Sequence, residues 1–195
     1  MTLECANTPL EADWAMQALV ELEAELSRPP LALVEPARPL VAYTILFGEV
    51  PNIGIQRRVR AAYAAVSRRP HRRAERGYVY AFRDVRDGDS AIVKIGSTIH
   101  VRRRISEWRK SLGARDDELA LLFSSSTEDV RLAEQLVHTL LYCEWQAKRV
   151  RVDTGAPLLE YFAVENLDAL RLLIAAVTRH VTWFTQARFI RSRLL

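Results

Sequence analysis

The feature that most constrains the fold is a change of periodicity after residue 77. Two short runs rich in aromatic and β-branched residues, 78–82 (YVYAF) and 91–95 (AIVKI), flank a segment that contains Asp87-Gly88. Such runs are typical of strands, and an Asp-Gly pair between them indicates a hairpin. The second strand is expected to stop at Gly96. The next apolar residues are spaced by four, three and four, which is the period of a helix: Val101, Ile105, Trp108 and Leu112.

The chain after this helix supplies further strands and helices. A third strand is expected at residues 119–123, followed by a helix that starts at the cap sequence 126–129 (STED) and continues to residue 141. Residues 148–152 and 158–164 could form another hairpin, and a last helix begins near Asn166. The sequence therefore predicts an α+β fold, in which a mostly antiparallel sheet of about three central strands is flanked by helices.

The chain before residue 77 is expected to be helical, with a proline-rich linker. Residues 9–26 have the pattern of an amphipathic helix, and residues 53–67 that of a basic helix. Residues 41–47 (VAYTILF) are expected to form either a strand or a buried segment. We expect three parts: an N-terminal extension (1–76), a central domain (77–164), and a C-terminal helix that packs on it (165–195).

Composition excludes several classes of protein. Hydrophobic residues make up 49% of the chain and charged residues 27%, which is the balance of a globular protein. No stretch approaches the 18 or so uncharged apolar residues of a transmembrane helix, and the acidic N-terminus lacks the pattern of a secretory signal. Cys5 and Cys143 are too few for a disulfide framework or a cysteine-based zinc site. We expect an intracellular protein, nuclear or cytoplasmic; the oligomeric state stays open.

Positive charge is concentrated in one block, residues 57–76. The chain has 28 basic and 24 acidic residues, and this block holds eight arginines and one glutamate. The rest of the chain therefore has 20 basic and 23 acidic residues. Such a cluster suits a surface that neutralises DNA phosphates, although a solvated face or a nuclear-import signal would have the same composition. The arginines are Arg57, Arg58, Arg60, Arg68, Arg69, Arg72, Arg73 and Arg76.

The order of these elements and their residues resembles the GIY-YIG nuclease superfamily. The resemblance is to the branch of the bacteriophage T-five-type DNA-binding domain and its fungal meiotically up-regulated relatives. It covers roughly residues 77–164 and departs from the usual motifs at Gly77, three residues before Tyr80 instead of two. The matching pieces are 77–80 (GYVY), 94–98 (KIGST), Arg104, Ala133-Glu134 with His138, and 160–162 (EYF).

The resemblance implies a role for each matching residue. Tyr80 would help to activate the attacking water, Arg104 would face the scissile phosphate, and Glu134 would hold Mg²⁺ or another divalent metal. Lys94 stands where the second motif usually has its first tyrosine, and Gly96 matches the glycine of that motif. The implied partner is DNA, and the implied reaction is hydrolysis of its phosphodiester bonds.

The chemistry of the residues is consistent with these roles and leaves alternatives open. A tyrosine has a pKa of about 10, so Tyr80 would need a neighbouring charge such as Lys94 to act as a base. Tyr80 could equally belong to the core. Glu134 and His138 share a helix face and could bind metal or form an exposed pair. Possible neighbours of the site are Tyr78, Gly96 and His138; Arg102 and Arg103 would meet solvent or the DNA backbone, and Glu160 would be a structural anchor.

Three functions remain as hypotheses at this level. The first is a metal-dependent DNA endonuclease, in which Tyr80, Lys94 and Arg104 are catalytic. The second is a DNA-binding module of the same fold without hydrolytic activity. The third is a protein-interaction adaptor, in which the arginine block is an import signal.

Overall fold

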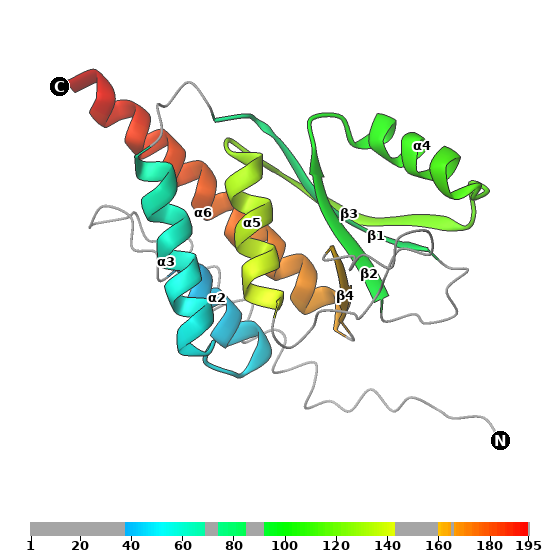
Figure 1. Ribbon diagram of the computed structural model, residues 1–195, viewed down its shortest axis with the longest axis horizontal. Coiled ribbons are helices and arrows are strands. Elements are labelled where there is room, and N and C mark those ends of the chain that lie inside the picture. Colours follow the sequence, from blue (N-terminus) through cyan, green and yellow to red (C-terminus); the bar gives the residue numbers. More distant parts are fainter. Residues whose placement is uncertain (1–37, 69–73, 85–91, 143–159, 165, 195) are drawn as a thin grey trace.

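The structure is a four-stranded antiparallel sheet with helices on both faces (Figure 1). The computed structural model describes residues 38–68, 74–84, 92–142, 160–164 and 166–194, with side chains to residue 190. Within these residues the strands are β1 (Gly77–Asp84), β2 (Ile92–Thr98), β3 (Leu119–Thr127) and β4 (Tyr161–Ala163). The helices are α2 (Arg38–Phe47), α3 (Ile53–Ser67), α4 (Val101–Leu112), α5 (Val130–Leu141) and α6 (Leu167–Leu194). The expected α+β class is confirmed.

The strand order is β3-β1-β2-β4, and every pairing is antiparallel. β1 and β2 form the expected pair, although their connection lies outside the described residues. The prediction that β2 stops at Gly96 was wrong, because Gly96 pairs with Tyr80 inside the ladder and the strand continues to Thr98. A glycine is needed there, since a Cβ on Gly96 would lie 2.8 Å from the Tyr80 hydroxyl oxygen.

β3 is longer than the sequence predicted, and α5 starts later. The pairing of β1 with β3 shifts between Ala81 and Phe82, whose partners are Phe123 and Leu121. Leu122 is therefore the extra residue of a bulge. Residues 126–127 belong to β3, so the expected hydroxyl cap was wrong. The cap of α5 is Asp129, whose side chain accepts a hydrogen bond from the backbone N–H of Leu132 at 3.1 Å.

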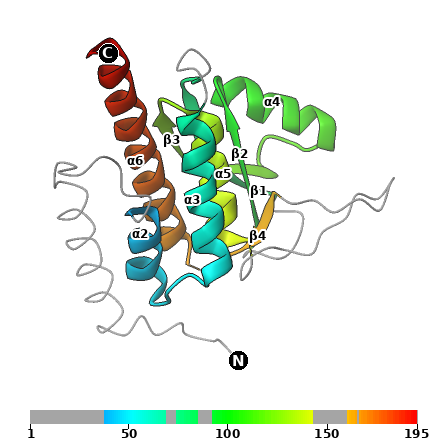
Figure 2. The same ribbon diagram turned by 60° about the vertical axis from the view of Figure 1, so that its left-hand side comes forward.

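The two faces of the sheet are covered by different helices. Figure 1 shows α4 on one face and α5 with α6 on the other, and Figure 2 shows α2 and α3 outside α5 and α6. Alternation along β1 sends Tyr80 and Phe82 towards α4, where they pack with Ile105. Val79 and Ala81 enter a larger core that includes residues of α2, α3, α5 and α6. The three-part division of the chain stays a prediction.

The helices before β1 are partly as expected. α3 occupies residues 53–67, as predicted, and the side chain of Asn52 caps it by accepting a hydrogen bond from Ile55 N–H at 3.0 Å. Residues 41–47 belong to α2, so the strand alternative was wrong and the buried one is confirmed. Leu40, Tyr43 and Leu46 point into the core, which is the spacing of a helix rather than of a strand. The helix expected at residues 9–26 lies outside the described residues.

The C-terminal segment completes the sheet and covers it. β4 pairs with β2, placing Phe162 opposite Val93. The other arm of the expected hairpin, residues 148–152, lies outside the described residues. α6 begins at Leu167, as expected, after Asn166, whose side chain accepts a hydrogen bond from Ala169 N–H at 2.9 Å. None of the helices in the described residues is long and apolar enough to cross a membrane.

Candidate functional site

Three of the predicted site residues meet around Trp108 on the α4 face of the sheet. The indole N–H of Trp108 donates to the Tyr80 hydroxyl at 3.3 Å. The Lys94 ammonium lies 4.2 Å from the centre of the Trp108 ring, and the Arg104 guanidinium carbon lies 5.2 Å from it. Two cations therefore share one aromatic side chain, which attracts both through the negative faces of its π-system.

Tyr80 is a buried hydrogen-bonding group. Its side chain is 1% exposed and its ring stacks 6.0 Å from that of Phe82. Burial raises the pKa of Tyr80, and hydrogen bonds from Arg104 and Trp108 oppose the shift. The cation that favours the phenolate is thus Arg104, where the sequence had suggested Lys94. With a raised pKa, Tyr80 is protonated at neutral pH.

Lys94 is buried as one half of an ion pair. Its side chain is 1% exposed, and its ammonium group contacts the Glu160 carboxylate and the ring of Tyr161, at 5.0 Å. Burial lowers the pKa of Lys94, and Glu160 opposes that shift. Glu160 also accepts a backbone hydrogen bond from Ile95 N–H at 2.9 Å, so it fixes the end of β4 against β2.

Arg104 reaches both the buried cluster and solvent. Its side chain is 42% exposed, and Nη1 lies 3.2 Å from the Glu107 carboxylate. A hydrogen bond with Tyr80 is the main cause that raises the pKa of Arg104. The guanidinium has five N–H donors, so donors beyond the one that contacts Glu107 are left to bind an anion.

Glu134 and His138 approach β2 from the opposite face, one turn apart on α5. The Ser97 hydroxyl donates to Glu134 Oε2 at 2.7 Å. His138 Nε2 donates to the Ile95 carbonyl at 3.1 Å, and burial lowers the pKa of His138. Lys94, which contacts Trp108, and Ser97, which bonds Glu134, are both residues of β2, so this strand joins the groups of the two faces.

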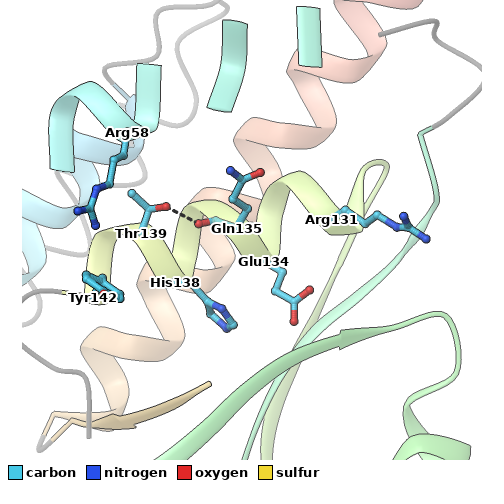
Figure 3. A pocket seen from close by; sticks show the side chains of 7 residues that line it. All are labelled: Arg58, Arg131, Glu134, Gln135, His138, Thr139 and Tyr142. Atoms are coloured by element: carbon cyan, nitrogen blue, oxygen red, sulfur yellow. Dashed lines mark hydrogen bonds between the residues drawn. The ribbon is translucent and has the colours of Figure 1, made fainter. Parts of the chain in front are cut away.

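An open groove runs along α5 past Glu134 and His138 (Figure 3). Its volume is about 460 Å³. Figure 3 shows Glu134 and His138 pointing towards β2, with an arginine at each end of the set. The lining side chains come from α3, α5 and the residue that follows α5: Arg58, Arg131, Glu134, Gln135, His138, Thr139 and Tyr142.

Glu134 fits the role of a single-carboxylate metal ligand. Ser97 bonds one of its oxygens, and the side chain lines the groove. No three histidine, cysteine, aspartate or glutamate side chains gather into a metal-binding group within the described residues. Mg²⁺ is commonly held by one or two carboxylates with water and substrate phosphates, so Glu134 alone suits this metal better than zinc.

The arginines predicted to bind DNA lie on two different sides of the molecule. Arg57, Arg58, Arg60 and Arg68 are exposed on α3 or at its end, whereas Arg102 and Arg103 are exposed on α4, across the sheet (Figure 1). Arg76 pairs with Glu128 at 2.5 Å. Tyr78 is partly exposed on the α4 side of β1. Arg69, Arg72 and Arg73 lie outside the described residues.

Sequence reasoning missed several residues of the site. Trp108 was assigned only to the apolar face of α4, although its position four residues after Arg104 places both on one face. Ser97 was noted within the second motif without its bond to Glu134. Arg131 and Tyr142 carried no sequence signal, because their relevance comes from the packing of α3 against α5.

Comparison with known proteins supports the central part of this description. Residues 77–184 match the family model of the T5orf172 domain. These residues include the whole sheet and most of α6, which extends past the predicted boundary at residue 164. No curated protein and no solved structure matches the chain. Since the match covers more than half of its length, the chain belongs to the T5orf172 domain family.

Proposed function

We propose that this protein binds DNA and hydrolyses its phosphodiester bonds as a metal-dependent endonuclease of GIY-YIG type. The observation that carries the proposal is the pair of solvent-accessible groups that converge on β2 from opposite faces. These are Arg104, which contacts Trp108 and Glu107, and Glu134, whose Oε2 accepts a hydrogen bond from the Ser97 hydroxyl. The family match adds the expectation of a DNA-binding, nuclease-like module.

Arg104 would bind the phosphate that is cut. A guanidinium donates two parallel hydrogen bonds to non-bridging phosphate oxygens, and these bonds strengthen as negative charge develops in the transition state. The contact with Trp108 and the ion pair with Glu107 fix the orientation of the side chain before the substrate arrives. Such preorganisation lowers the cost of stabilising charge at the moment of reaction.

Glu134 would hold the divalent metal, with Ser97 fixing its carboxylate. Bound Mg²⁺ supplies positive charge at the phosphate and makes water a stronger nucleophile near neutral pH. His138 would keep the helix face of Glu134 in register with β2 through its bond to the Ile95 carbonyl.

Tyr80 and Lys94 would act through their neighbours. Both side chains are 1% exposed, so the groups that reach solvent are Arg104 and Glu134. Tyr80 would position Arg104, and Lys94 with Glu160 would position Trp108 and the start of β4. Both are therefore positioning residues in this proposal instead of water-activating ones.

A DNA-binding module without hydrolytic activity is the second candidate. The observation that favours it is the raised pKa of Tyr80, which leaves the residue proposed as a base protonated at neutral pH. The exposed arginines of α3 and α4 would then account for the whole function by contacting phosphates.

Nicking of supercoiled plasmid in Mg²⁺ distinguishes the two candidates. We expect wild-type protein to nick, and Glu134→Gln and Arg104→Ala to lose roughly 100-fold or more, the usual cost of removing a group that stabilises transition-state charge. Arg171→Ala is the matched control, because Arg171 is an exposed arginine of α6 paired with Asp168, 3.5 Å away. It should nick within threefold of wild type.

Two results would contradict hydrolysis at this site. The first is no nicking by wild-type protein with either Mg²⁺ or Mn²⁺, while it still binds DNA in a salt-sensitive way. That result would establish the non-hydrolytic module. The second is unchanged nicking by both variants, with thermal unfolding like that of wild type.

A further inference from the structure

The groove that contains Glu134 has a cationic side chain at each end (Figure 3). Arg131 lies near the start of α5, and Arg58 reaches the other end from α3. Neither belongs to the α4 face, where Arg104 lies. The proposed metal ligand Glu134 therefore has cations on its own side of the sheet, in addition to Arg104 on the other side.

The α5 residues of the groove form a stripe long enough to accompany several nucleotides of a DNA strand. Arg131, Glu134, His138 and Tyr142 are separated by three, four and four residues, so they form one stripe along the helix. At 1.5 Å per residue the stripe is roughly 16 Å long. One strand of B-DNA advances about 3.4 Å per nucleotide along the duplex axis, so a stripe parallel to that axis spans roughly five nucleotides. Glu134 lies between the ends, closer to Arg131.

Arg58 is held in place by an aromatic ring. Its guanidinium carbon lies 5.0 Å from the centre of the Tyr142 ring, and the Tyr142 side chain is itself partly exposed. Within the described part of the chain Arg58 forms no ion pair. Packing of α3 on α5 thus presents an oriented cation whose charge is not neutralised by those residues.

Arg131 has a partner that it can exchange for a phosphate. Its Nε lies 3.5 Å from the Glu75 carboxylate, and both side chains are exposed. An exposed pair of this kind contributes little to stability, so giving it up is inexpensive. Among the described residues that line the groove or pair with its arginines, the acidic ones are Glu75, already paired with Arg131, and Glu134, the proposed metal ligand.

We propose that the groove between α3 and α5 is the path of a DNA backbone, with Arg131 and Arg58 contacting phosphates on either side of the one at Glu134. Tyr142 orients Arg58 and offers its exposed ring to the sugar-phosphate chain. The inference rests on the proposed function in placing the substrate at Glu134. It extends the bound strand along the α3–α5 side of the sheet from the phosphate at β2, which Arg104 reaches from the α4 side, and gives Arg102 and Arg103 no part in this path.

The test measures binding in a background that does not cleave. Full-length Glu134→Gln protein is titrated onto a fluorescein-labelled 20-base-pair DNA duplex, without divalent metal, between 50 and 300 mM KCl. We expect Arg58→Ala/Arg131→Ala to lower affinity about tenfold or more. The slope of log affinity against log salt should fall by about 2, because each lost phosphate contact removes about 0.9.

The matched control removes the same charge elsewhere. Arg171 and Arg179 are exposed on α6 and do not line the groove, so Arg171→Ala/Arg179→Ala should bind within twofold of the Glu134→Gln parent. Thermal unfolding of both double variants checks that they fold, and Arg58→Lys/Arg131→Lys should recover most of the affinity.

The outcomes separate this inference from the proposed function. If the groove variant binds within twofold of its parent with an unchanged salt slope, or if both double variants lose affinity equally, the groove is not the path. If wild-type protein nicks DNA but either of these binding results is found, the endonuclease proposal stands and the groove proposal is refuted. Absence of nicking together with the expected loss of binding would leave the path standing and refute hydrolysis.

Discussion

Acid should destabilise this fold through one buried histidine, His180 of α6. The ring is buried at the interface with α2 and α3, 5.5 Å from the Tyr63 ring in an edge-on arrangement. Neither ring nitrogen has a hydrogen-bond partner among the described residues. Burial, with a smaller contribution from the charge of Arg38, lowers the pKa of His180 to about 4. The imidazole is therefore neutral in the folded state across the physiological range.

The sign and size of the effect follow from the two pKa values. In the unfolded chain His180 takes up a proton below its ordinary pKa of 6.5, whereas in the folded protein it does so only below about 4. The stabilisation is complete above pH 6.5 and is lost as pH falls to 4. The free energy of unfolding should decrease by about 2 kcal/mol at pH 5 and about 3 kcal/mol at pH 4.

Urea unfolding followed by tryptophan fluorescence at pH 7 and pH 5 measures this decrease. His180→Phe keeps an aromatic ring against Tyr63 and cannot be protonated, so it should reduce the loss between the two pH values by about 2 kcal/mol. His138, whose pKa burial also lowers, adds a loss of the same sign that the variant retains. An equal loss in wild type and variant would refute the assignment to His180.

Four further substitutions test the packing around the site and the core, each by urea unfolding. Glu160→Gln leaves the buried Lys94 ammonium without its counter-charge and should lower the free energy of unfolding by about 3 kcal/mol. Lys94→Met should lower it less, because Glu160 is 42% exposed and stays hydrated. A larger loss for Lys94→Met than for Glu160→Gln would contradict the pairing. Gly96→Ala sets a Cβ 2.8 Å from the Tyr80 hydroxyl and should cost about 1–3 kcal/mol, and an unchanged midpoint would show that the close approach is absent. Tyr63→Phe removes a buried hydroxyl without a partner in the described residues and should be neutral or stabilising; a loss above about 1 kcal/mol would reveal a bond to that hydroxyl.

Local sequence patterns determined most elements but not all of their ends. The hairpin strands, α3, α4 and α6 follow from periodicity and caps that lie within a few residues. Gly96 was expected to end β2, but it lies inside the strand because its partner Tyr80 fills the space that a side chain would occupy. Only the pairing of the two strands reveals this. Residues 41–47 were ambiguous because a short apolar run has the same composition in a strand and in a buried helix.

The candidate site was only partly predictable for a related reason. Lys94 stands out in an apolar strand, but its burial depends on Trp108, Tyr161 and Glu160, which lie 14 or more residues away in the sequence. The sequence therefore singled out Lys94 but could not show that its side chain is buried. Arg58 and Tyr142 illustrate the same limit, since only the packing of α3 against α5 brings them together.

The hydrogen bond between His138 and Ile95 has a consequence for how copies of this protein behave towards one another. The N–H and C=O of Ile95 point to the outer edge of the sheet, where Glu160 accepts from the first and His138 donates to the second. An exposed strand edge with free backbone groups invites pairing with another chain and aggregation. Among the described residues β4 pairs only with Ile92–Lys94 of β2, and the His138 imidazole occupies the Ile95 carbonyl that an incoming strand would need. A second strand could therefore pair with Ile95 only by displacing the His138 imidazole.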